Sequence, residues 1–108
     1  MHTITAQDLE QMQARGEKFA LINTLSPEDF VTTKIPGSQN IPQDSDDFVK
    51  RVEAAAGGKD QPVVVYCASE QCHSSTKGGE KLEAAGFSNV TDFEGGAKEW
   101  KAAGQQLA

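Results

Sequence analysis

Two thiols and an imidazole stand close together in the sequence, directly after a run of apolar residues. Cys67 ends the run that begins at Val63, and Cys72 and His73 follow in the next polar segment. A thiol becomes a nucleophile and a metal ligand when it loses its proton, and an imidazole can supply positive charge or a hydrogen bond near neutral pH. The segment therefore indicates thiol chemistry: covalent group transfer, redox exchange or metal binding.

Metal binding is the weakest of these interpretations. A structural zinc site takes four ligands, commonly as two separated pairs, and Cys67, Cys72 and His73 offer three with no second pair elsewhere. The chain also lacks the glycine-rich patterns GxxxxGK[ST] and GxGxxG that bind nucleotides. We therefore expect neither a metal nor a cofactor.

The position of Cys67 favours a functional thiol. The run 63–66 is β-branched without polar alternation, which is typical of a central parallel strand, and ligands bind at the carboxyl ends of such strands. A helix is predicted over 75–85, so its first amides and those of the loop can point at Cys67. Such N–H groups stabilise negative charge, and we expect them to lower the thiol pKa and to hold a persulfide or an oxyanion. The alternative is that Cys67 is a buried, inert small apolar residue.

The other two residues leave alternatives open. Cys72 can act as a resolving thiol that attacks an oxidised or persulfidated Cys67, or it can simply point into the fold. His73 can supply charge or a hydrogen bond to an anion, or it can be a solvated loop histidine.

The remaining sequence alternates between strand and helix patterns, which predicts an α/β fold. We expect a mostly parallel sheet of four or five strands with helices on both faces, in one domain over residues 1–108. Thr5 is a predicted helix N-cap and Gly16 a helix stop. The expected helices cover 6–15, a short segment opened by 26–29, 44–56, 75–85 and 97–103, and the expected strands lie near Ile4 and over 19–23, 39–41, 63–66 and 89–92.

Composition limits the partners. The 108 residues carry a net charge of −6, which argues against nucleic acid and anionic membranes as general partners. No segment approaches the length of a membrane span, and the N-terminus lacks the pattern of a signal peptide. Two cysteines are too few for the set of disulfides that stabilises small secreted domains. We expect a cytoplasmic protein that is a monomer or a weak dimer.

Four motifs in order resemble single-domain rhodaneses, the sulfurtransferase homology family. They are LINTLSPEDF, IPGSQNIP, VVVYC with its loop and helix, and NVTDFEGGAKEW, and the likeness runs from about Ile4 to Gly104. The resemblance implies a rhodanese-like three-layer sandwich and a catalytic cysteine at Cys67, whose sulfur accepts a sulfane sulfur as a persulfide. It also implies that backbone amides cradle the outer sulfur, over the loop residues Ala68, Ser69, Glu70, Gln71, Cys72 and His73.

The sequence departs from the family pattern in three places. No arginine follows the cysteine, and Cys72-His73 stand where an arginine is common, which bears on the use of the thiosulfate dianion. Asn23 and Leu25 replace a common aspartate and arginine. Thr33-Lys34-Ile35 replaces the common Gly-His-Ile. Trp100 matches a family tryptophan that we expect to pack in the core.

The resemblance therefore implies an enzyme, a thiosulfate sulfurtransferase-like protein of the rhodanese type. Its partners would be a small sulfur donor, thiosulfate or a persulfide, and a thiophilic acceptor, including a sulfur-acceptor protein. The alternatives are a non-catalytic binding or sulfur-carrier module and a redox protein that uses Cys67 and Cys72. A related phosphatase or arsenate reductase would need an arginine where His73 stands.

Overall fold

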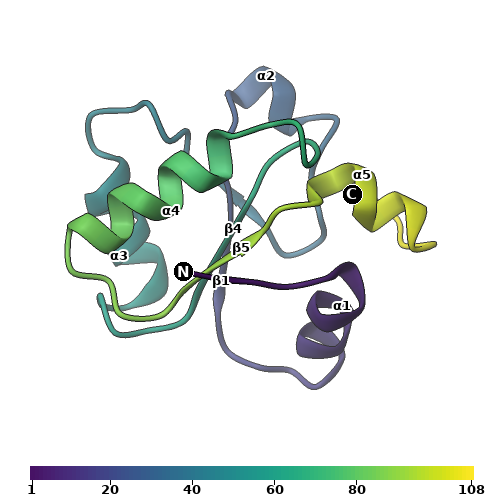
Figure 1. The fold of residues 1–108 in the computed structure, drawn as a ribbon, viewed down its shortest axis with the longest axis horizontal. Coiled ribbons are helices and arrows are strands. Elements are labelled where there is room, and N and C mark those ends of the chain that lie inside the picture. The colour runs from purple at the N-terminus through teal and green to yellow at the C-terminus, as the bar shows by residue number, and fades with distance from the viewer.

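A computed structural model describes residues 1–108 as alternating strands and helices (Figure 1). The helices lie on both sides of one central sheet. The strands are β1 (His2–Thr3), β2 (Ala20–Asn23), β3 (Gln39–Asn40), β4 (Val63–Tyr66) and β5 (Val90–Phe93), and the helices are α1 (Ala6–Ala14), α2 (Pro27–Phe30), α3 (Phe48–Ala56), α4 (Ser74–Ala84) and α5 (Gly96–Ala102).

The five strands form one parallel sheet in the order β1-β5-β4-β2-β3. β4 is central and pairs with β2 on one side and β5 on the other, so that Val65 lies opposite both Ile22 and Asp92. Every residue of β2 and β4 is buried. The predicted α/β class and the mostly parallel sheet are confirmed.

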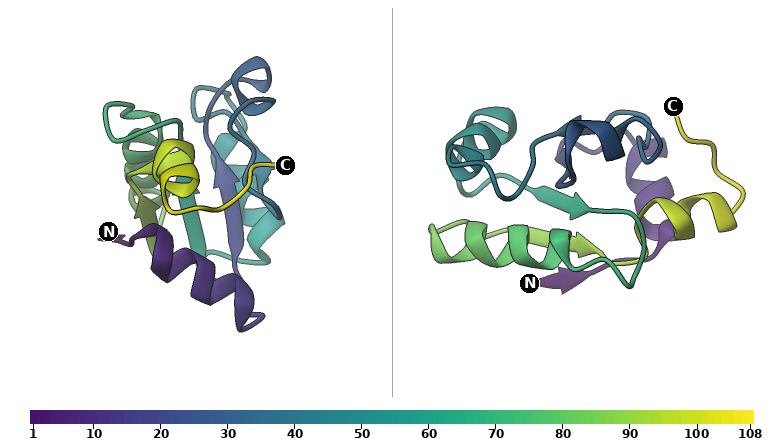
Figure 2. Two further views of the ribbon diagram at one scale, coloured as in Figure 1. Left: turned by 90° about the vertical axis from the view of Figure 1, so that its right-hand side faces the viewer. Right: turned by 90° about the horizontal axis from the view of Figure 1, so that it is seen from above.

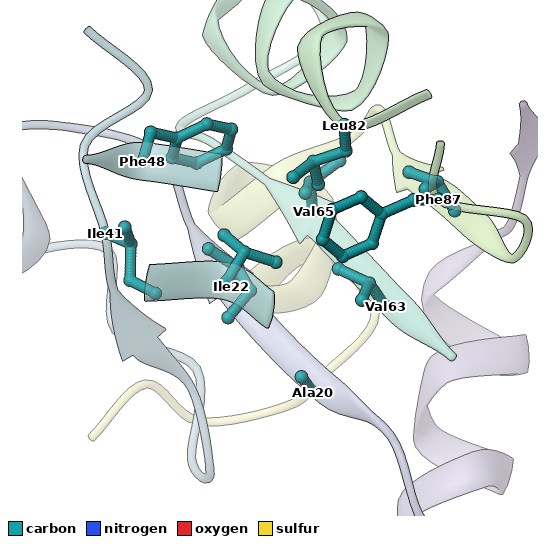
Figure 3. Packing of buried hydrophobic residues seen from close by; sticks show 10 residues of the cluster. Ala20, Ile22, Ile41, Phe48, Val63, Val65, Leu82 and Phe87 are labelled. Carbon is teal, nitrogen blue, oxygen red and sulfur yellow. The ribbon is translucent and has the colours of Figure 1, made fainter. Parts of the chain in front are cut away.

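Two apolar clusters cover the two faces of the sheet because successive strand residues point to opposite sides. The first cluster joins Val63 and Val65 of β4 to Phe48 of α3 and Leu82 of α4 (Figure 3). The second cluster, on the opposite face, joins the remaining β4 residues to α1 and α5 and includes Leu9, Val64, Tyr66, Phe93 and Trp100. The packing role predicted for Trp100 is confirmed.

Local capping explains where the first helices begin. The Thr5 hydroxyl accepts from the Asp8 amide at 3.2 Å, and the Asp8 carboxylate accepts from the Thr5 amide at 3.1 Å, which closes a capping box. Gly16 follows α1 with φ +69, a conformation that favours glycine. Ser26 caps α2 in the same way by accepting from the Asp29 amide. The predicted Thr5 cap and Gly16 stop are confirmed.

Most predicted boundaries differ from the observed ones by at most one residue, whereas the start of α3 is wrong by four residues and the first strand ends before Ile4. α3 begins at Phe48 rather than residue 44, because the Ser45 hydroxyl and amide both donate to the Pro42 carbonyl and hold a turn there. Short polar side chains commonly compete with helix formation in this way. The first strand is His2–Thr3, and Ile4 lies just after it, with its amide still donating to the Asp92 carbonyl at 3.3 Å.

The hydroxyl of Tyr66 ties β4 to a turn that is distant in the sequence. This oxygen accepts from the Ile35 amide at 3.0 Å and lies 2.8 Å from the Thr33 carbonyl and 3.0 Å from the Ser38 hydroxyl. Tyr66 and Ile35 are fully buried, so no water replaces these partners. The turn before β3 is therefore held in place by the residue that directly precedes Cys67.

Tyr66→Phe should lower the free energy of unfolding by about 1–3 kcal/mol, because it leaves the buried Ile35 amide without an acceptor. Urea unfolding followed by the fluorescence of Trp100 measures this loss. A change smaller than about 0.5 kcal/mol, the usual range for surface substitutions, would contradict the anchoring role.

Candidate active site

The Cys67 thiol lies beyond the carboxyl end of β4, between the following loop and the first turn of α4. Its side chain is fully buried. Sγ donates to the Cys72 carbonyl oxygen at 3.2 Å and lies 3.5 Å from the Ser75 hydroxyl. A protonated thiol therefore fits this arrangement, because a carbonyl oxygen accepts from S–H and repels a thiolate.

Burial raises the pKa of the Cys67 thiol, and a hydrogen bond with the Cys72 side chain raises it further. The Ser75 hydroxyl and amide act in the opposite direction, but the pKa remains above its ordinary value. The prediction of a lowered pKa is wrong for this conformation. The physical reason is that removal from water penalises the thiolate more than the start of α4 stabilises it.

The middle of the loop after Cys67 contains backbone amides that have no hydrogen-bond acceptor in the protein. The Cys72 amide donates to the Ser69 carbonyl at 3.0 Å and forms a turn, whereas the amides of residues 68–71 donate to no acceptor in the protein. Glu70 and Gln71 are exposed, and Ala68 is half-buried. Unpaired amides in such a short loop are the groups that an anion-binding nest requires.

Hydrogen bonds to α5 hold the end of this loop that follows β4. The carbonyls of Cys67 and Ala68 accept from the Ala97 and Lys98 amides of α5 at 3.0 and 2.9 Å. Figure 2 shows the loop after β4 reaching the start of α5. Gly96 allows the start of α5 to lie this close to the loop. It has φ +58, a conformation that favours glycine, and a Cβ at this position would overlap the Cys67 carbonyl.

Thr24 and Ser74 anchor the other end, where α4 begins. The Ser74 hydroxyl donates to the Thr24 carbonyl at 3.0 Å and lies 3.0 Å from the Thr24 hydroxyl, which in turn donates to the Tyr66 carbonyl at 3.3 Å. These bonds join the start of α4 to the ends of β2 and β4. Sequence analysis missed both residues, since an isolated threonine or serine gives no local signal of such a long-range bond.

Neutral hydrogen bonds support the neighbouring turn, where the resemblance leads one to look for an aspartate and an arginine. Asn23 donates to the Thr33 hydroxyl at 3.0 Å and accepts from the Leu25 amide at 3.0 Å. Asn40 donates to the Leu25 carbonyl at 2.8 Å. The support near the site is therefore provided by amides without an ion pair.

His73 and the charged loop residues face solvent. His73 is exposed and lies at the N-cap position of α4 without a capping bond from its side chain. The structure brings no three His, Cys, Asp or Glu side chains together as metal ligands. Beside the loop is an open hollow of about 210 Å³, lined by Glu70, Gly95, Lys98, Glu99 and Ala102. Its charges are mixed, so it offers no strongly positive surface.

Comparison with known proteins decides the family. The sequence model of the Rhodanese-like domain matches residues 5–103. The chain belongs to the rhodanese-like domain family. No curated protein matches the chain significantly. In the structure, no helix is both long and apolar enough to cross a membrane.

Solved structures share this fold. A thiosulfate sulfurtransferase from Pseudomonas aeruginosa is similar to the whole chain with a TM-score of 0.88 and 24% identity, and the match covers 20% of that protein. The BH2092 protein from Bacillus halodurans is 23% identical, with a TM-score of 0.82 over 97% of this chain and 74% of that one. The Alr3790 protein from Anabaena sp. is 25% identical, with a TM-score of 0.82 over 95% of this chain and 79% of that one. The predicted rhodanese-like architecture is confirmed.

Gly96→Ala should be one of the most destabilising single changes near the site. Gly104 is a matched control, because it also has positive φ but a Cβ there meets nothing within 4 Å. We expect Gly104→Ala to cost about 1–2 kcal/mol from its backbone conformation. Gly96→Ala should cost about 3 kcal/mol or more, because it also displaces the Cys67 backbone. Equal losses for both variants in urea unfolding would contradict the close approach at Gly96.

The raised pKa of Cys67 predicts how the reaction rate of the thiol depends on pH. In a Cys72→Ser variant, the rate of alkylation by iodoacetamide should keep rising from about pH 7 to about pH 9, because the thiolate fraction still grows over this range. Mass spectrometry of the Cys67 peptide gives this rate. A plateau below about pH 8 would show that the thiol pKa is lowered instead.

Proposed function

We propose that this protein is a sulfurtransferase that carries a sulfane sulfur as a persulfide on Cys67. The observation that carries the proposal is the buried thiol at the end of the central strand, next to four loop amides without protein acceptors. Membership of the rhodanese-like family supports the same class of reaction. The expected partners are a small sulfur donor and a thiophilic acceptor.

The reaction has two half-reactions through one covalent intermediate. The Cys67 thiolate attacks the sulfane sulfur of thiosulfate or of a thiol persulfide. The donor's S–S bond breaks, and sulfite or the donor thiolate leaves with the electron pair. A thiophilic acceptor then attacks the outer sulfur of the persulfide, and the Cys67 thiolate leaves.

The loop must rearrange when the thiol loses its proton. The Cys72 carbonyl oxygen lies 3.2 Å from Sγ and accepts its proton, so a thiolate or a persulfide anion at the same place would face a repelling lone pair. Moving this carbonyl away would allow loop amides to face the outer sulfur. Preorganised dipoles of this kind stabilise an anion without a side-chain base.

The charges around the loop favour donors with little negative charge. The loop 68–73 contains no arginine or lysine, and Glu70 and His73 are exposed. Lys98 shares its hollow with Glu70 and Glu99, which offset its charge. A thiosulfate dianion therefore meets no fixed cation pair, and we propose thiol persulfides as better donors.

In a Cys72→Ser variant, which keeps Cys67 as its one thiol, incubation with a thiol persulfide, and separately with thiosulfate, should add one sulfur atom to the Cys67 peptide, and cyanide should remove it. Cys67→Ser should reduce sulfur transfer to background without unfolding, because the hydroxyl is a poor nucleophile at this site. Mass spectrometry after brief exposure identifies the modified peptide. If Cys67 takes sulfur from neither donor, the non-catalytic binding module becomes the better assignment.

A further inference from the structure

The second cysteine is positioned against the first by the fold of the loop. The turn from Ser69 to Cys72 directs the Cys72 carbonyl at Cys67 Sγ, 3.2 Å away. The Cys72 side chain also raises the pKa of the Cys67 thiol, so the two side chains interact across the loop. Both cysteines are free thiols, with Cys67 buried and Cys72 half-buried. Two free thiols therefore belong to one short loop whose turn brings Cys72 against Cys67, and the Cys72 thiol is partly accessible from solvent.

A thiol held beside a persulfide has a large kinetic advantage over an external acceptor. Holding two reacting groups in one chain replaces a bimolecular encounter by an intramolecular step. An external acceptor must reach a side chain that is fully buried, whereas the backbone carbonyl of Cys72 already lies 3.2 Å from Cys67 Sγ. Cys72 therefore lies beside Sγ, the atom that becomes the inner sulfur of the persulfide.

We propose, on the basis of the persulfide function above, that Cys72 resolves the Cys67 persulfide and releases sulfide. The Cys72 sulfur attacks Cys67 Sγ, and the bond between Sγ and the outer sulfur breaks. The outer sulfur leaves as HS⁻ with the bonding electron pair, and the Cys72 proton neutralises one of its two negative charges. The sulfane sulfur gains two electrons, and the two cysteine sulfurs lose them in forming the Cys67–Cys72 disulfide.

An external dithiol completes the cycle. It attacks the disulfide, becomes a disulfide itself, and returns both cysteines to thiols. The half-exposed sulfur of Cys72 is the accessible point for this attack. The protein would thus use a sulfane donor and a dithiol to release sulfide. Cys67 and Cys72 would first be oxidised to the disulfide, and the dithiol would then reduce them.

The loop can close this disulfide at little structural cost. A disulfide requires the two Cβ atoms to approach within about 4 Å. The ends of the loop are held by α5 and by Thr24, but the amides of 68–71 make no protein hydrogen bonds that such a movement would break. Loss of the thiol proton also removes the bond that holds the Cys72 carbonyl against Sγ.

The test compares three proteins exposed anaerobically to glutathione persulfide and quenched with acid. The wild type should release about one sulfide per chain and yield a peptide in which Cys67 and Cys72 are linked, and an added dithiol should make release continuous. Cys72→Ser should keep a stable sulfur on Cys67. The matched control, Cys72→Ser with Ser88→Cys, keeps two thiols but moves one to the exposed turn before β5, and it should behave like Cys72→Ser.

The outcomes separate the two proposals. If Cys72→Ser takes up no sulfur, the persulfide function itself fails. If Cys72→Ser is charged but the wild type also keeps its sulfur on Cys67 without a disulfide, only the resolving role is overturned. Sulfur found on the Cys72 peptide would show transfer between the cysteines in place of sulfide release and would also overturn it. Cys72→Ala repeats the comparison if the serine variant does not fold.

Discussion

Burial of β4 on both faces is the constraint on which the rest of the structure depends. Its side chains alternate between the cluster with α3 and α4 and the cluster with α1 and α5, so the strand can neither slip nor turn without exposing apolar surface. This rigidity places Cys67 at one point beyond the sheet edge. The hydroxyl of Tyr66 and the carbonyls of Cys67 and Ala68 then attach neighbouring segments to the same strand.

The loop after Cys67 is held by hydrogen bonds at both ends, whereas the backbone amides in its middle have no partners in the protein. α5 holds the backbone at Cys67 and Ala68, and Ser74 holds the start of α4 against Thr24, whereas the amides of residues 68–71 make no protein hydrogen bonds. At rest the thiol is buried, its pKa is raised, and the Cys72 carbonyl accepts its proton. This arrangement favours the protonated thiol, and its unpaired loop amides suit the negative charge that the proposed persulfide would bring.

The absence of a basic residue in the loop shapes the proposed chemistry. A fixed arginine would stabilise a dianionic donor, whereas amide dipoles suit the single charge of a persulfide. The neutral bonds of Asn23 and Asn40 give the neighbouring turn its support without introducing charge. The loop also carries a second thiol on Cys72, whose carbonyl oxygen lies 3.2 Å from Cys67 Sγ, and the resolving step proposed for it would link sulfur transfer to disulfide chemistry.

The sequence by itself determined the sheet, the helix order and the position of Cys67, because hydrophobic periodicity and capping residues act over a few neighbours. It misplaced the start of α3, where the Ser45 turn competes with the helix. Only the tertiary structure decided that burial raises the pKa of Cys67, that the Cys72 carbonyl faces its sulfur, and that Gly96 admits the start of α5. These features depend on desolvation and on contacts between segments far apart in the chain, for which no local pattern of residues carries a signal.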